Sequence, residues 1–223
     1  MNPSSGAGRF VPVGLVALAL IPVVAGSARL VEVLGGPALL PTDLRFAASP
    51  APLVVHIVSA IGFALLGAFQ FSAGIRRSRP GWHRRAGRLL VALGLAVTFS
   101  ALWLTLLFPR KEGTGELLVG FRLLAGSGMG ISIILGFAAI RSRDIARHRA
   151  WMTRAYALGL GAGTQAFTVG FGVAVLGSGV VRHDLLMGAA WVINLAVAEW
   201  FIRRPAARRA SRTRTRAALA GSR

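Results

Sequence analysis

Six long apolar stretches run along the chain, and short segments between them hold most of its charged residues. A helix needs roughly 20 mostly apolar residues to cross the hydrocarbon core of a bilayer, whereas a barrel strand alternates in polarity and crosses in about ten. Stretches of this length therefore predict an all-α integral membrane protein, a bundle of about six transmembrane helices. The predicted helices are residues 10–28, 51–75, 89–108, 117–140, 155–176 and 185–202.

This pattern divides the chain into a transmembrane helical domain, residues 1–203, and a basic tail, residues 204–223. The tail is rich in arginine, alanine and serine without apolar periodicity, so we expect it to be disordered or to lie on anionic lipid. The first stretch has a second interpretation. Arg9, the apolar run and the small residues "VAGSA" also fit a signal peptide cleaved near Ala28. We favour a retained helix; cleavage would leave five spans.

Composition supports lipid as the solvent. Apolar residues make up 54% of the chain and charged residues only 15%, whereas soluble domains carry about a quarter charged residues. The chain has no cysteine, which excludes disulfides, iron–sulfur clusters and thiolate chemistry.

The net charge of +19 follows a topological pattern rather than a nucleic-acid footprint. Twenty of the 26 basic residues fall at Arg9, in segments 76–88 and 141–154, and in the chain from Arg203 onward, all on one predicted side. Five of the seven acidic residues fall on the other side. The positive-inside rule then predicts that both termini are cytoplasmic. The expected partners are the bilayer, with anionic lipids at its cytoplasmic face, and no nucleic acid.

Two junctions between the apolar stretches carry a similar short sequence motif, which we call the junction word. "IRRSRPGWHR" at 75–84 aligns with "IRSRDIARHR" at 140–149, which places His83 over His148 at an offset of 65 residues. Such a match is typical of a duplicated two-helix hairpin, with the second and third helices repeated as the fourth and fifth in parallel orientation. Duplication would explain why the same junction word occurs twice on the predicted cytoplasmic side.

The stretches "HRRAGRLLVALG" and "HRAWMTRAYALGL" resemble two signatures of a bacterial multi-pass membrane family known as domain of unknown function 2306. The resemblance covers about residues 54–162 and implies a membrane fold in the bacterial cytoplasmic (inner) membrane. The family has no established activity, so it assigns no catalytic residue. The matching positions are His56, His83, Arg84, Gly87, Arg88, His148, Arg149, Trp151, Met152, Arg154 and Tyr156.

The four histidines have two interpretations. In the first, His83 and His148 cap helix ends beside the arginines and touch lipid phosphate. In the second, histidines at matched depth pair as ligands of b-type haem, His83 with His148 at the inner boundary and His56 with His183 at the outer one. The haem hypothesis requires two facing imidazoles, and His83 and His183 are predicted to lie shallow.

Arg122 is predicted about five residues inside the fourth helix. It could extend its guanidinium to the outer headgroups. Alternatively it faces His56, with His183 and Asp184 nearby, and forms an outer polar site for an anionic head group, a quinone or a haem propionate.

Further polar residues lie deeper. Glu199 precedes Arg203 by four residues, which favours a helical ion pair. Gln165 and Asn194 are mid-helix amides that ordinarily bond between helices. The alternative is a polar path for a small solute or protons, lined by these residues and Arg122.

Glycine spacing predicts close helix packing at Gly126/Gly130 and Gly159/Gly163. Segment 126–130 could also interrupt its helix. No protease, triad, metal or phosphate-loop pattern is present, so we assign no catalytic residue and no metal ligand. The sequence favours a scaffold or an accessory subunit of a membrane-protein partner. The alternatives are a haem- or quinone-linked redox protein and a small-solute or proton-coupled transporter.

Overall fold

The computed structural model describes the backbone of residues 4–220 and the side chains of residues 10–204. Within this part of the chain all regular structure is helical. The elements are α1 (Ser4–Val33), the 3₁₀ turn η1 (Leu44–Phe46), α2 (Ala51–Gln70), α3 (Ala73–Ser78), α4 (Pro80–Leu107), α5 (Glu116–Arg141), α6 (Ile145–Gly159), α7 (Gly161–Leu176) and α8 (Val180–Ala220).

Five of these helices, α1, α2, α4, α5 and α8, are long and apolar enough to cross a membrane. The bent pair α6 and α7, with a 45° angle at its break, provides a sixth span if it is counted as one. The predicted all-α membrane fold is therefore confirmed. The orientation of the termini and the hairpin duplication stay predictions.

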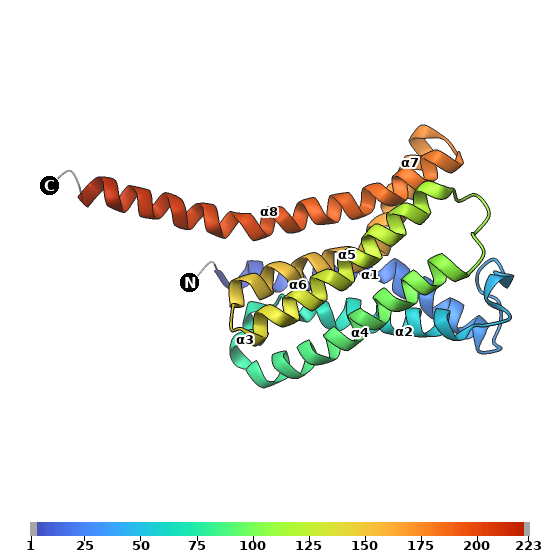
Figure 1. The fold of residues 1–223 in the computed structure, drawn as a ribbon, viewed down its shortest axis with the longest axis horizontal. Coiled ribbons are helices and arrows are strands. Elements are labelled where there is room, and N and C mark those ends of the chain that lie inside the picture. Colours follow the sequence, from blue (N-terminus) through green and yellow to red (C-terminus); the bar gives the residue numbers. More distant parts are fainter. Residues whose placement is uncertain (1–3, 221–223) are drawn as a thin grey trace.

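The connections gather at two ends of the bundle (Figure 1). The α2–α3–α4 turn and the α5–α6 turn lie at the end nearer the N-terminus, which we call the arginine-rich end and define by residues 71–88 and 141–154. The α1–α2, α4–α5 and α7–α8 connections, residues 34–50, 108–115 and 177–179, lie at the other end, which we call the loop end. This grouping places chemistry from distant parts of the sequence together.

The core lies where α2, α4, α5 and α6 meet, around Phe63, Ile133 and Tyr156. Helix α1 packs against α2 and α7, and α8 packs against α5, α6 and α7. Large apolar side chains also face outward, among them Leu124 and Phe171, which are 73% and 75% exposed. Soluble monomers rarely expose large contiguous apolar surfaces, so the outer face suits hydrocarbon.

Glycine allows α4 and α5 to approach closely. A Cβ added at Gly94 would lie 2.6 Å from the Cδ1 of Ile133, and one at Gly130 would lie 2.8 Å from the Cγ2 of Thr98. Helix α5 runs without interruption through Gly126 and Gly130. The expectation that segment 126–130 could break the helix is therefore wrong, because these glycines serve packing instead.

The break falls between α6 and α7, at Leu160, inside the single helix predicted at 155–176. A break in the helical hydrogen-bond ladder is tolerated in lipid only where neighbours satisfy the freed groups. Here the Nδ2 of Asn194 donates to the carbonyl of Ala157 at 3.0 Å. The hydroxyl of Thr164 donates to the Oδ1 of Asn194 at 2.7 Å. Asn194 of α8 therefore holds both sides of the break.

Among the helices that begin earlier than predicted, α4 and α6 differ most from the prediction. Helix α4 begins at Pro80 instead of residue 89, and α6 begins at Ile145 instead of residue 155. Proline suits the first helical position, because a backbone N–H at this position would have no acceptor within the helix and its absence therefore costs no hydrogen bond. His83 and His148 consequently lie in the first turns of α4 and α6, and the two helix starts share the offset of 65 residues that relates the repeated words.

Helix α8 extends past residue 202, where the last span was predicted to end, to Ala220. The predicted tail disorder falls on residues whose side chains lie outside the described part of the chain, and it stays a prediction.

We expect the substitution Gly163→Ala to lower stability. Its Cβ would lie 2.3 Å from the backbone oxygen of Leu18 in α1, and backbone cannot move aside as a flexible side chain can. Overpacking of this kind typically costs about 1–3 kcal/mol. Gly170 of the same helix has open space around it, so Gly170→Ala is the matched control and should be neutral or slightly stabilising. Thermal unfolding of both variants in detergent measures the difference. Equal midpoints would contradict the close contact between α1 and α7.

Candidate functional site

At the loop end, His56 is held in one tautomer. Its Nδ1 lies 3.1 Å from the Oγ of Ser100 on α4, and that hydroxyl lies 2.6 Å from the carbonyl of Ala96. Because the single hydroxyl proton is donated to Ala96, the Nδ1–H of His56 donates to Ser100. The Nε2 of His56 therefore keeps its lone pair.

Arg122 extends from the second turn of α5 toward the same region. It lies within electrostatic range of His56, Arg45 and Asp184. The structure thus places Arg122 near two of the residues proposed as its neighbours. The loop end places the imidazole of His56 within electrostatic range of the guanidinium of Arg122, an arrangement that suits a ligand carrying both a hydroxyl and an anionic or carbonyl oxygen.

Asp184 closes the start of α5 from a different helix. Its side chain is 1% exposed and accepts hydrogen bonds from the backbone N–H of Gly115, at 3.0 and 3.1 Å, and from that of Leu118, at 3.0 Å. A carboxylate at a helix N-terminus satisfies free N–H groups and complements the helix dipole. The Nδ1 of the neighbouring His183 lies 3.6 Å from the Oδ1 of Asp184. Asp184 is therefore an interhelical cap.

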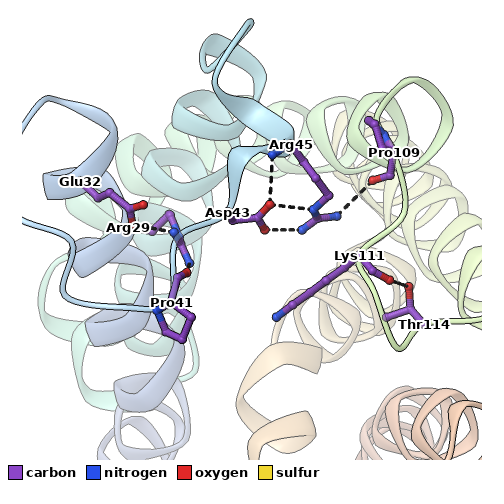
Figure 2. A network of polar contacts seen from close by, with 8 residues as sticks. All are labelled: Arg29, Glu32, Pro41, Asp43, Arg45, Pro109, Lys111 and Thr114. Atoms are coloured by element: carbon purple, nitrogen blue, oxygen red, sulfur yellow. Dashed lines mark hydrogen bonds and ion pairs between the residues drawn. The ribbon is translucent and has the colours of Figure 1, made fainter.

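An ion-pair network ties the loops together above these residues (Figure 2). The Nε of Arg45 donates to Asp43 at 2.8 Å, and its Nη1 donates to the carbonyl of Pro109 at 3.2 Å. Arg29 bonds Glu32 at 2.5 Å, its i+3 neighbour. The side-chain hydrogen bond from Arg45 is the main cause that lowers the pKa of Asp43 below its ordinary value. Arg45 thus joins segment 34–50 to the α4–α5 loop.

At the arginine-rich end, the structure brings His83 and His148 within electrostatic range of each other. The Nδ1 of His148 lies 2.8 Å from the carbonyl of Gly136. A carbonyl only accepts, so the Nδ1–H of His148 is the donor, and the Nε2 is left for another partner. The Nδ1 of His83 is buried and has no hydrogen-bond partner.

The rest of the second junction word contacts neighbouring helices. The guanidinium of Arg154 lies 4.7 Å from the centre of the Trp151 ring and bonds Glu199 of α8 at 2.5 Å. Glu199 also pairs with Arg203 at 3.2 Å, the helical pair proposed from the sequence. Met152 lies against Gly136. In the first word, Arg84 and Arg88 are exposed, and Gly87 has open space around it.

The residues proposed as a polar path are bonded across helices. The Nε2 of Gln165 donates to the carbonyl of Met187 at 3.2 Å, and Asn194 bonds both sides of the α6–α7 break. Glu199 pairs with two arginines. Among the side chains of residues 10–204, no group of three or more histidine or acidic residues is arranged to hold a metal ion.

Sequence reasoning missed several partners. In the sequence, Ser100 is one small residue of an apolar helix, and the residues around it do not indicate that it orients His56. The carbonyl of Gly136 carries no sequence signal. Arg76 was counted only among the topological arginines, although it donates to the carbonyl of Gln70 at 2.8 Å. The available clue was its position directly after the helix predicted at residues 51–75.

A protein-family comparison now identifies the chain. The model described as "Predicted membrane protein (DUF2306)" matches residues 53–202, most of the chain. The chain belongs to this family, which confirms the resemblance drawn from the two signature stretches. No match was found among curated proteins or among solved structures.

We expect Asp184→Asn to lower stability although the side chain keeps its size. The amide offers one weaker acceptor and points an NH₂ group at backbone N–H donors, and a buried unsatisfied donor costs about 1–3 kcal/mol. Glu112→Gln, an exposed acid in the α4–α5 loop, is the control and should leave stability unchanged. Thermal unfolding in detergent compares the two. If Asp184→Asn unfolds together with the control, the capping role is wrong.

Proposed function

We propose that this chain is a membrane-embedded scaffold or accessory subunit without a reaction of its own, in the bacterial cytoplasmic membrane. The observation that carries the proposal is the use of its deep polar side chains. Gln165, Asn194 and Glu199 are all bonded to neighbouring helices.

These bonds argue against a transport path. A solute or proton path needs polar groups that exchange partners as the solute passes. Asn194 cannot leave Ala157 without exposing a backbone carbonyl to lipid, which costs several kcal/mol. The carboxylate of Glu199 is bonded to both Arg154 and Arg203, so it would have to leave two ion pairs to exchange partners. The polar residues therefore suit a bundle with one stable packing.

The orientation belongs to the same proposal. The arginine-rich end carries both junction words, and the loop end carries most of the acids. The positive-inside rule supports a cytoplasmic arginine-rich end with both termini on that side.

Reconstitution tests the absence of transport. Proteoliposomes loaded with a pH-sensitive dye should show the proton flux of empty liposomes, because Gln165, Asn194 and Glu199 are each bonded to a neighbouring helix. Flux above that background, lost in Glu199→Ala or Arg122→Ala and kept in the exposed-loop control Glu112→Ala, would instead establish the transporter alternative.

Native extraction tests the accessory role. Polymer nanodiscs cut directly from the membrane should contain this chain with a second membrane protein in fixed stoichiometry, measured by quantitative mass spectrometry. A chain recovered alone or only with itself would contradict the accessory subunit.

A second candidate, a b-type haem protein, is favoured by the tautomers of His56 and His148. Metal-ligating histidines usually donate one ring N–H to a carbonyl or another acceptor and present the other nitrogen to the metal. Both histidines make this kind of bond through Nδ1, to Ser100 and to Gly136. His83 lies within electrostatic range of His148 and is the candidate for the second ligand. Haem bound there would supply one-electron redox chemistry.

A visible spectrum tests this candidate. Protein purified from haem-replete cells should show a Soret band and an α-band that sharpens on dithionite reduction. His148→Ala should remove the band, because it deletes the fixed ligand, whereas the exposed neighbour variant Arg147→Ala should keep it. A featureless wild-type spectrum would remove haem and leave the scaffold proposal untouched.

A further inference from the structure

At the arginine-rich end, Arg76 connects a group of donors that come from four helices. It is a half-buried residue of α3, and its Nη1 donates to the carbonyl of Gln70 at the end of α2. It lies within electrostatic range of His83 in α4 and of Arg149 in α6. Segments far apart in the sequence therefore converge on one guanidinium.

Two polar atoms in this group are buried without a hydrogen-bond partner, the Nε2 of Gln70 and the Nδ1 of His83. A buried donor or acceptor without a partner costs about 1–3 kcal/mol, and native structures keep few of them. Arg76 bonds the backbone of Gln70 and lies within electrostatic range of His83, so the two atoms indicate a bound group that supplies the missing partners.

The charges around the group have one sign. Those acting on His83 are Arg76, His148 and Arg84, and those acting on Arg76 are Arg149 and Arg77. Burial first, and then the guanidiniums of Arg149 and Arg77, lower the pKa of Arg76 below its ordinary value. None of the ion pairs among residues 10–204 involves Arg76, Arg77, Arg84 or Arg149. The loop end differs, because Asp43 and Asp184 balance its arginines.

We propose that Gln70, Arg76, His83 and Arg149 form a binding site for a phosphate group, supplied by the headgroup of an anionic phospholipid. A phosphate has several acceptor oxygens and negative charge, and guanidinium groups bind it through paired N–H donors. One group can therefore satisfy the unpartnered donors and the unbalanced charge together.

The position of the site favours a lipid as the source of the phosphate. It lies where α2 ends and α4 begins, at one end of two predicted spans, which is the depth of a headgroup. Phe69, which precedes Gln70 in α2, and Leu89, six residues after His83 in α4, are 40% and 49% exposed and offer apolar surface to an acyl chain. A soluble phosphate uses the same donors without this surface.

This site goes beyond the proposed function and is independent of it. A scaffold or a transporter could each carry it, whereas the haem candidate uses His83 as a ligand. Its test is lipid binding, which neither the spectrum nor the flux measurement reports.

Native mass spectrometry of the full chain in detergent tests the site, with phosphatidylglycerol titrated as the anionic probe and phosphatidylcholine as the zwitterionic one. We expect Arg76→Gln and Arg149→Gln to bind phosphatidylglycerol about tenfold more weakly than the unsubstituted chain. Arg149 is exposed, so its variant keeps the fold if Arg76→Gln does not. The control is Arg85→Gln, which removes the same charge from an exposed position on α4.

Inorganic phosphate distinguishes the two sources. If millimolar phosphate displaces the lipid and its binding is weakened by the same two variants, the site takes a free phosphate group. If phosphate has no effect and the variant pattern holds, the ligand is a lipid. The site is wrong if Arg85→Gln weakens binding as much as Arg149→Gln, because the attraction would then belong to the general surface charge. It is also wrong if no variant differs from the unsubstituted chain.

Discussion

Hydrocarbon offers no hydrogen bonds, so a polar group that this chain places between its helices needs a partner other than the lipid chains. Asp184, Asn194 and Gln165 each meet this requirement by bonding the backbone of another helix. The bonds also decide which helices can be neighbours. Helix α8 carries all three side chains or their acceptors, and it is thereby fixed against α5, α6 and α7.

The coarse fold could be predicted because it depends on local properties. Apolar length predicts each span, and the spacing of charged residues predicts which connections share an end. The break at Leu160 could not be predicted in the same way. A run of glycines permits a bend, but the bend also needs Asn194 to receive the carbonyl of Ala157, and that partner is distant in sequence. Segment 126–130 has similar glycines and no such partner, and it stays helical.

The candidate sites show the same division. Histidines and arginines near span ends could be found from the sequence, because such residues are conspicuous beside apolar runs. Their geometry could not, since the tautomer of His56 depends on Ser100 and that of His148 on a backbone carbonyl. The imbalance between the two ends also depends on rotation of the helices. Asp43 and Asp184 lie close to arginines at one end, whereas Arg76 at the other end has only basic neighbours in range.

The contact of Gly163 with the backbone of Leu18 has a consequence for biosynthesis. Helix α1 is synthesised before α7, yet part of the surface that α1 covers belongs to α7. Until α7 is inserted, the face of α1 that will contact α7 is exposed to lipid, and α1 packs against α2. The bundle can therefore be completed only late in synthesis. A nascent chain arrested before α7 would expose an unpacked face of α1, which quality-control proteases can recognise.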